Sequence, residues 1–354
     1  MLDNRLRENK QILLIGPCYF NNSDITGGIV VLFEDLLKYC DDYDIQYTVV
    51  DTNKANYTNK IVAYFSIITK IFRQTKKSNH ISLHGTSKDY LLIAPFAVFF
   101  SKLYKKKISL RKFAGSFYDI YEKSNFLFKN TYKYSLKNAD FLYFETKFLV
   151  EKFLKFNENV LWWPNSRFLN DEHRTSPIFR KRFVFISQVK TTKGIYEFME
   201  ASNYYDSSYV FDMYGPIMDD DFERRIENYK NINYRGILKA NKVPQTLSDY
   251  DVLILPTYHE GEGYPGIVIE AFSVGLPVTS TKWNSIPEIV ENQHNGIIIP
   301  IKDVSELVNA IGYYTADNYS DFSKNSFESF TDFDSNNVYL KFFNRIKLED
   351  YELK

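Results

Sequence analysis

Short apolar runs alternate with stretches of helical periodicity along the whole chain. Residues 11–16 form an apolar run that ends in glycine, typical of a buried strand, and apolar positions recur at helical spacing from Gly28 to Tyr39. A second strand is indicated at 47–51 and a second helix at 59–75, and the alternation then continues. Strands that alternate with helices predict a mostly parallel, doubly wound α/β sheet.

The alternation breaks over residues 162–177, where two prolines and a polar cluster are typical of a linker between domains. It then restarts and predicts further strands over residues 183–187, 209–215, 251–256, 277–281 and 296–300. We therefore predict two Rossmann-like domains, residues 1–170 and 171–325, that face each other across a cleft, because open α/β sheets bind ligands at the carboxyl ends of their strands. The last stretch, residues 326–354, is expected to contribute a helix that packs back on the first domain.

The composition is that of an ordinary globular protein. The chain has 354 residues, of which 44% are hydrophobic and 25% charged, and its two cysteines, Cys18 and Cys40, imply no disulfide framework. We therefore expect a reducing, cytoplasmic compartment. The polar first ten residues are unlike a secretory signal, and the longest apolar run, Leu91 to Phe100, is shorter than the roughly 20 residues that span a bilayer. The protein is thus expected to be soluble or peripheral to a membrane.

The net charge of zero hides a strong asymmetry. The first 170 residues contain 25 Lys and Arg against 16 Asp and Glu, and residues 54–112 contain 13 basic residues and a single acid, Asp89. Basic amphipathic segments at 60–77 and 97–107 are typical of contact with an anionic membrane surface, here the inner face of the membrane. The alternative is that the apolar faces pack on the sheet and the lysines are solvated. No nucleic-acid-binding motif accompanies the charge, so nucleic acid is not expected as a partner.

The most informative stretch is residues 256–278, which follow a predicted strand, are rich in glycine and enter a helix. Backbone N–H groups of Gly266 and Ile267 lie near the expected helix start, where a diphosphate can bind. Glu262 precedes them in the loop, and Glu270 follows in the helix, where its carboxylate can accept hydrogen bonds from ribose hydroxyls. The alternative for such a pair is a capping glutamate and a solvated glutamate on a surface helix.

This stretch resembles the Glu-x7-Glu signature of retaining glycosyltransferase family 4, which has the GT-B fold. Glu262 and Glu270 match the two glutamates, and the match continues downstream through Ala271, Gly275, Leu276 and Pro277. The resemblance covers essentially the whole second domain and extends more weakly into the first. It implies that Glu262 contacts the donor sugar and that Glu270 contacts the nucleotide ribose.

Residues 187–194, SQVKTTKG, resemble a second element of the family, in which an Arg and a Lys bind the donor diphosphate. Lys193 matches the lysine, whereas Gln188 stands at the arginine position. Lys190 is the candidate to compensate, although a lysine is a point charge and lacks the planar fork of arginine. The resemblance thus implies catalytic roles for Glu262, which orients the sugar, and for Lys193, which stabilises the departing diphosphate.

The remaining candidates stand at strand ends and in glycine-rich turns. His84 ends a predicted strand and is a candidate to assist deprotonation of the acceptor, unless it is a structural histidine. A membrane or an anionic acceptor is expected to contact Arg111, Lys112, Lys105, Lys106 and Lys107. The donor site is expected to be lined by Gly27, Gly28, Lys190, Lys193, Gly215, His259, Glu262, Gly263, Tyr264, Gly266, Ile267 and Glu270.

No cofactor or metal is expected. The chain lacks a G-x-G-x-x-G motif, which argues against a nicotinamide dehydrogenase, and its five histidines are not spaced as metal ligands. We predict transfer of a hexosyl group from a nucleoside diphosphate sugar, UDP-linked, to a glycan or lipid-linked glycan in surface polysaccharide assembly. Two alternatives remain: a nucleotide-sugar epimerase of the same fold, and a non-catalytic, membrane-associated binding or scaffold protein, which Gln188 favours and the intact glutamate loop opposes.

Overall fold

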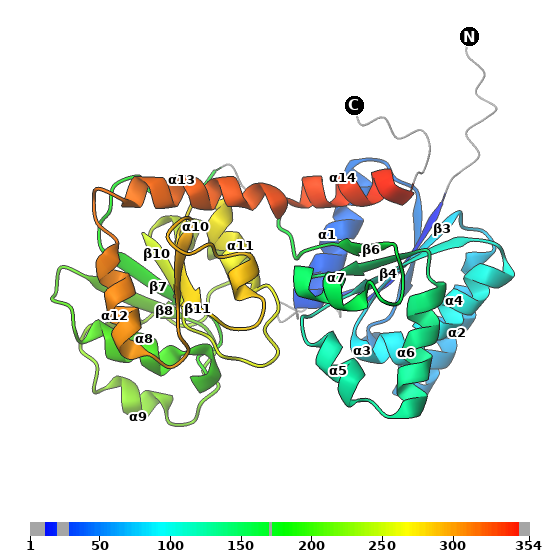
Figure 1. Ribbon diagram of the computed structural model, residues 1–354, viewed down its shortest axis with the longest axis horizontal. Helices are drawn as coiled ribbons and strands as arrows, with labels where there is room; N and C mark the ends of the chain where they lie inside the picture. The colour runs from blue at the N-terminus through cyan, green and yellow to red at the C-terminus, as the bar shows by residue number, and fades with distance from the viewer. Residues whose placement is uncertain (1–10, 20–27, 170–171, 347–354) are drawn as a thin grey trace, which may run out of the picture. The chain divides into compact units, whose positions relative to one another are not determined.

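The computed structural model describes residues 11–19, 28–169 and 172–346, which belong to two compact units. The first unit comprises Met1–Pro164 together with Asn336–Lys354, and the second comprises Asn165–Ser335. Each unit is built on one six-stranded sheet with helices around it (Figure 1). The break after Pro164 lies within the stretch that the sequence indicates as a linker. The predicted cleft and the predicted roles of the two domains stay predictions.

In the first unit, six parallel strands lie in the order β2-β1-β3-β4-β5-β6. Their bounds are β1 Ile12–Gly16, β2 Tyr47–Asp51, β3 His80–Gly85, β4 Lys107–Lys112, β5 Phe141–Phe144 and β6 Val160–Trp162. The inner strands are buried on both faces, which explains why β1 is a continuous apolar run. Leu13 and Ile15 face a core shared with α2, α4 and α6, since residues of these helices belong to the same cluster.

The helices of the first unit connect these strands. Their bounds are α1 Gly28–Asp42, α2 Lys60–Thr75, α3 Ser87–Leu92, α4 Ala94–Leu103, α5 Phe117–Lys123, α6 Phe126–Asn138 and α7 Lys147–Phe153, with a short 3-10 helix, η1, at Lys54–Asn56. Local side chains start several of them: Asn59 accepts from the first amides of α2, and Thr86 and Asp89 form a capping box at α3. Helix α4 packs between α2 and α6, so these three helices form one layer (Figure 1).

Helix α14, Ser335–Ile346, lies against the other face of the first sheet. Tyr339 contacts Tyr39 of α1, and Phe342 packs with Trp163 at a ring-centroid distance of 4.5 Å. Phe342 also contacts His80 of β3. Because side chains alternate along a strand, His80 and His84 lie on the face that α1 and α14 cover, whereas Ile81 and Leu83 belong to the opposite core. This covered face therefore buries histidine and arginine side chains among aromatic rings.

The second unit repeats the architecture with parallel strands in the order β12-β11-β10-β7-β8-β9. The strands are β7 Arg182–Ile186, β8 Val210–Tyr214, β9 Ile232–Tyr234, β10 Val252–Leu255, β11 Val278–Thr281 and β12 Gly296–Ile299. The α-helices are α8 Ile195–Ser202, α9 Phe222–Ile226, α10 Val243–Ser248, α11 Gly266–Ser273, α12 Val304–Tyr313 and α13 Tyr319–Ser329. The 3-10 helices are η2 Thr191–Lys193, η3 Ala240–Lys242, η4 Ile286–Glu288 and η5 Phe330–Asp332. Helix α8 packs with α12, and α11 packs with α10 and α13 (Figure 1).

Two loops meet at the carboxyl edge of the second sheet, where β7 and β10 end. Gly194 follows η2 with φ +78°, and a Cβ at this position would overlap the backbone carbonyl of Pro256, just beyond β10. The amide of Tyr258 donates to the carbonyl of Thr192 across the same junction, at 2.9 Å. Only glycine combines the left-handed backbone with so close an approach. Gly194 therefore fixes the loop after β7 against the loop after β10.

The predicted pair of doubly wound parallel sheets is confirmed by these strand orders. The edge strands β6 and β9 were not predicted, because three residues each leave too short a pattern. In the part of the chain that is described, no helix combines the length and the apolar character needed to traverse a bilayer.

Trp163 is expected to be a main source of stability in the first unit. It is buried against Phe342, Tyr143 and His84. Trp163→Ala should lower the free energy of unfolding by about 3–5 kcal/mol, the usual cost of truncating a buried aromatic side chain, as measured by equilibrium urea denaturation. Trp163→Phe keeps an aromatic ring in this site and should cost clearly less. Equal losses for the two variants would show that the ring contacts are not what stabilises the unit.

The junction at Gly194 predicts a second difference in stability. Gly194→Ala should lower the free energy of unfolding by more than about 2 kcal/mol, because strained backbone adds to an overlap with backbone that no side-chain rotation relieves. Gly236 is the matched control, since its φ is +83° but no heavy atom lies within 4 Å of a Cβ there. Gly236→Ala should cost only the strain, about 1–2 kcal/mol. Equal losses in urea denaturation would contradict a close approach at Gly194.

Candidate functional site

The candidate site is built on the start of helix α11. Strand β10 is buried throughout, and the chain leaves it through a loop that ends at Pro265, directly before the first helical residue, Gly266. Pro265 occupies the N-cap position and makes no side-chain cap hydrogen bond. The first amides of an α-helix have no partner within the helix, so this start is suited to receive an anion. Gly266 and Ile267, both predicted to line the donor site, stand there.

Lys193 and Glu262 form an ion pair between the two loops. The Nζ of Lys193 lies 2.5 Å from Oε2 of Glu262, and the two side chains are only 12% and 11% exposed. The hydroxyl of Thr257 lies 3.0 Å from the same Glu262 oxygen. The structure thus brings together the lysine of the first predicted element and the first glutamate of the second. Neither side chain is freely solvated.

His259 lies beside this ion pair. Its Nδ1 is 3.2 Å from the hydroxyl of Thr192, and its amide donates to the hydroxyl of Thr257. Partial burial, and then the positive charge of Lys193, lower the pKa of His259 below its ordinary value. The ring is therefore neutral at pH 7 and able to exchange hydrogen bonds with an uncharged sugar. Its predicted place in the donor site stays a prediction.

The second glutamate of the pair, Glu270, is bound by Arg167. The Nε of Arg167 lies 2.6 Å from Oε1 of Glu270, with the side chains 20% and 21% exposed. The NH1 group of Arg167 donates to the carbonyl of Ser166 at 2.9 Å. The NH2 group occupies the space that a Cβ on Gly266 would need. Sequence analysis missed Arg167, because it lies in the linker stretch, where the pattern carries no sign of chemistry.

Two of the predicted donor-site residues have structural roles in the second unit. Tyr264 is buried, its hydroxyl donates to Glu288 at 2.5 Å, and its carbonyl accepts from Asn165. The Tyr264 ring therefore supports the loop from within, and the predicted place of Tyr264 in the donor site stays a prediction. Gly215 has φ +143°, and a Cβ there would overlap the carbonyl of Ser187, so packing accounts for the glycine.

The other donor-site predictions remain predictions. Gly263 is buried in the glutamate loop, and Lys190 is half-buried at the start of η2, whereas Gln188 is exposed. In the first unit, Gly28 begins α1 with open space around its Cβ position. Gly27 lies outside the described residues.

His84 is the clearest correction. Its ring has no exposed surface, its Nε2 lies 2.9 Å from the hydroxyl of Ser82, and it packs against Phe33 and Trp163. Burial, and then the charge of Arg111, lower the pKa of His84 well below its ordinary value. The predicted role in deprotonating an acceptor is wrong, because α1 and α14 cover the face of β3 on which His84 lies.

Arg111 and Lys112 are also buried, contrary to the prediction that they meet a membrane or an acceptor. The guanidinium of Arg111 stacks 4.4 Å from the ring of Trp163, and the ammonium of Lys112 lies over Phe117. Burial lowers the pKa of Arg111 to about 10 and that of Lys112 to about 8. Aromatic faces stabilise both cations inside the unit. Lys105 and Lys107 are exposed and Lys106 is half-buried, so these three remain candidates for surface contact.

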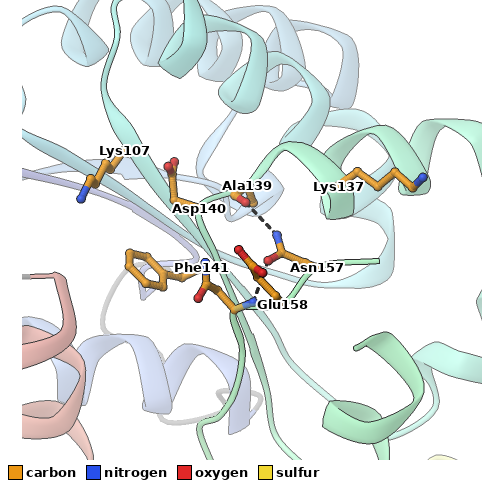
Figure 2. Close-up of a pocket in the computed structure, with 8 residues that line it drawn as sticks. Lys107, Lys137, Ala139, Asp140, Phe141, Asn157 and Glu158 are labelled. Carbon is orange, nitrogen blue, oxygen red and sulfur yellow. Dashed lines mark hydrogen bonds between the residues drawn. The ribbon is translucent and has the colours of Figure 1, made fainter. Parts of the chain in front are cut away.

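A cavity of about 390 Å³ opens at the amino edge of the first sheet, where strands β4, β5 and β6 begin. Figure 2 shows its lining, which includes Lys107, Asp140 and Asn157. Asp140 accepts from the amide of Ile108, and the side-chain amide of Asn157 donates to the carbonyls of Leu136 and Ala139. These groups join loops to strands, and parallel sheets bind ligands at the other edge. We therefore do not assign the functional site to this cavity. Among the described residues, no three His, Cys, Asp or Glu side chains gather as metal ligands do.

Comparison with known proteins points to the same segment. Residues 180–317 match the family model of group 1 glycosyl transferases. WcaL of Salmonella typhimurium, assigned to colanic acid biosynthesis as a glycosyltransferase, is 30% identical over 148 residues, which is 38% of this chain and 36% of that protein. The UDP-Gal:alpha-D-GlcNAc-diphosphoundecaprenol alpha-1,3-galactosyltransferase of Escherichia coli is 30% identical over 149 residues, 39% of this chain and 38% of that protein. The matched region thus spans little more than a third of these relatives.

The fold is shared over a longer stretch. The crystal structure of HepE from Anabaena in complex with UDP superposes with a TM-score of 0.73 at 13% identity, and covers 95% of this chain and 99% of that one. The two six-stranded parallel sheets are therefore those of the GT-B fold. Within this fold, the segment that is similar to the group 1 glycosyl transferases holds Lys193, Glu262 and Glu270.

Proposed function

We propose that this protein transfers a hexosyl group, with retention of anomeric configuration, from a UDP-linked donor to a hydroxyl of a lipid-linked glycan. The observation that carries the proposal is the presence of two ion pairs, Lys193–Glu262 in the loop before α11 and Arg167–Glu270 on α11 itself. Three of these four residues lie in the segment that matches the family model. A helix start bordered by paired cations and carboxylates has the groups that a nucleoside diphosphate sugar requires.

Each part of the donor has a complementary group in this site. The positive end of the α11 dipole and the ammonium of Lys193 favour the diphosphate. The carboxylate of Glu270 suits the two ribose hydroxyls, and that of Glu262 suits hydroxyls of the sugar, because charged acceptors make the strongest hydrogen bonds. Glu262 and Lys193 contact each other before the donor arrives, so little reorganisation is needed when it binds.

The same groups support the reaction. The bond between C1 of the sugar and the diphosphate oxygen breaks, and the acceptor hydroxyl forms a new bond to C1 as its proton is released. Negative charge grows on the diphosphate, where Lys193 and the helix amides stabilise it. Positive charge grows at the sugar ring, near the Glu262 carboxylate. Preorganised charge in a partly buried site stabilises this charge separation more strongly than water does.

The identity of the donor and the acceptor is inferred from the relatives. HepE is crystallised with UDP, and the Escherichia coli relative is named for a UDP-galactose donor and a diphosphoundecaprenol-linked acceptor. A UDP-sugar and a lipid-linked glycan are therefore the substrates that we propose, with a place in surface polysaccharide assembly at the inner face of the membrane.

The layer of α2, α4 and α6 supports contact with that membrane. None of these three helices contains Asp or Glu. We call the outer surface of this layer the α2–α4–α6 face. Its exposed apolar residues include Ile61, Phe65, Phe72, Phe96, Phe99, Leu103, Phe126 and Leu127. Its exposed basic residues are Lys60, Lys70, Arg73, Lys102, Lys133 and Lys137, with Lys76 and Lys77 directly after α2.

Packing on the sheet accounts for only part of the apolar character of these helices. In α2, Ala63, Ile67 and Ile71 are fully buried, whereas Ile61 is 84% and Phe65 75% exposed. The helix thus has a second apolar surface that no packing within the unit requires. Exposed apolar residues among lysines suit an anionic lipid surface, where the apolar groups insert and each basic residue contributes about 1 kcal/mol.

Donor binding is tested by a thermal-shift screen of UDP-, GDP- and ADP-sugars. The wild-type protein should be stabilised by the uridine class, and Glu270→Ala should lose that ligand-induced shift, because the ribose hydroxyls lose their acceptor. Glu260→Ala is the matched control, since Glu260 is an exposed glutamate of the same loop. It should keep the full shift.

The outcomes of the screen separate the candidate functions. If no nucleotide sugar stabilises the wild-type protein, the donor site is wrongly assigned. Epimerisation of a bound donor without any acceptor would indicate an epimerase, and tight donor binding without turnover on any lipid-linked glycan would indicate a binding protein. Transfer of the sugar to such a glycan supports the proposal.

Membrane contact is tested by sedimentation with vesicles. The wild-type protein should pellet with phosphatidylglycerol-containing vesicles and remain in solution with pure phosphatidylcholine. Lys76→Glu with Lys77→Glu should weaken binding at least tenfold, because more than about 1.4 kcal/mol of attraction is lost, and Phe65→Ser with Phe99→Ser should also weaken it. Ile237→Ser, which changes an exposed apolar residue of the second unit, should have no effect. Binding that ignores lipid charge would rule out this face as an electrostatic membrane contact.

A further inference from the structure

Arg167 is held in place by backbone as well as by its side chain. Its amide donates to the carbonyl of Phe333 at 3.0 Å, and its carbonyl accepts from the amide of Ser335 at 2.9 Å. Its guanidinium bonds Glu270 and the carbonyl of Ser166. The side chain thus starts from a fixed backbone position, which limits the conformational freedom that it would lose in binding a ligand.

The guanidinium of Arg167 also lies directly against the start of α11. Its NH2 group fills the space beside Gly266 where any other residue would place a Cβ. The guanidinium therefore lies beside the first residue of the helix and bonds Glu270 of the same helix. Lys193 enters from the loop after β7 and holds Glu262. A cation from each of two separate segments thus pairs with one of the two glutamates.

The charge balance of the site favours a further cation. A nucleoside diphosphate brings about two negative charges to a place that already holds two carboxylates, Glu262 and Glu270. Lys193 offsets one of these charges and the half-buried Lys190 of the same loop can offset a second as a point charge, whereas Gln188 is neutral and exposed. An arginine is suited to neutralise the remaining negative charge of the diphosphate, because its planar guanidinium binds two phosphate oxygens at once.

We propose that Arg167 binds the diphosphate of the donor and supplies the guanidinium that Gln188 does not. This inference rests on the proposed function. Without donor, Arg167 holds Glu270 at 2.6 Å. When the donor binds, the ribose hydroxyls take over the Glu270 carboxylate and the guanidinium turns to the phosphate oxygens. The Arg167–Glu270 ion pair therefore belongs to the donor-free protein. When the donor binds, its phosphates replace Glu270 as the partner of Arg167, and its ribose replaces Arg167 as the partner of Glu270.

The test compares UDP with uridine by isothermal titration calorimetry. Arg167→Ala should weaken UDP binding about tenfold to hundredfold and leave uridine binding nearly unchanged, because only UDP carries the phosphates. Arg167→Lys should recover part of the loss. Arg167→Ala combined with Gln188→Arg should recover more of it, since the guanidinium is restored from the loop after β7. Arg174→Ala is the matched control, because Arg174 bonds Ser273 at the far end of α11, and it should bind UDP as the wild type does.

Two results would overturn this inference while leaving the proposed function intact. One is UDP binding by Arg167→Ala that equals that of the wild type. The other is an equal loss of UDP and uridine binding in a variant that melts as a folded protein, which would show that Arg167 only positions Glu270. Failure of the wild-type protein to bind UDP at all would instead overturn the proposed function, and this inference with it.

Discussion

The close approach of two loops at the carboxyl edge of the second sheet is the constraint on which the candidate site depends. Gly194 passes so near the Pro256 carbonyl that no side chain fits between them. This contact brings Lys193, at the end of one loop, to Glu262 in the other, although 69 positions separate them in the chain. The chemistry of the site therefore follows from a backbone requirement: two parallel strands end side by side, and a left-handed glycine lets the loops that follow them touch.

The two ion pairs are better explained by ligand binding than by a contribution to the stability of the folded protein. Partly buried charges lose hydration, and their mutual attraction compensates for that loss only in part. Both pairs keep 11–21% of their side-chain surface in solvent, at the start of a helix whose N-cap residue offers its amides no side-chain acceptor. A ligand that brings phosphates to the cations and hydroxyls to the carboxylates satisfies all four groups at once. The four charged groups are therefore complementary to the ligand that we propose.

The sequence predicted what depends on local pattern and missed what depends on tertiary neighbours. Buried parallel strands are continuous apolar runs, and the Glu262–Glu270 spacing lies within one loop and helix, so both were visible. His84 and Arg111 stand at strand ends, where ligands commonly bind, but the α1 and α14 side of the sheet buries them. Arg167 was missed for the opposite reason. It comes to Glu270 from a linker 103 positions away, and no periodicity marks such a contact.

The basic character of the first unit divides into two physically different parts. Arg111 and Lys112 are buried against Trp163 and Phe117. They count among the basic residues of the sequence, but their charges are not at the surface, where a partner could bind them. Asp89, the acid of residues 54–112, is buried and paired with Lys54, so it does not reduce the charge of the surface. What remains is the α2–α4–α6 face, where lysines surround exposed phenylalanines. Solubility alone would favour lysines without the phenylalanines. Both features suit the anionic lipid surface that we propose as a partner, because such a surface attracts the lysines and accepts the rings.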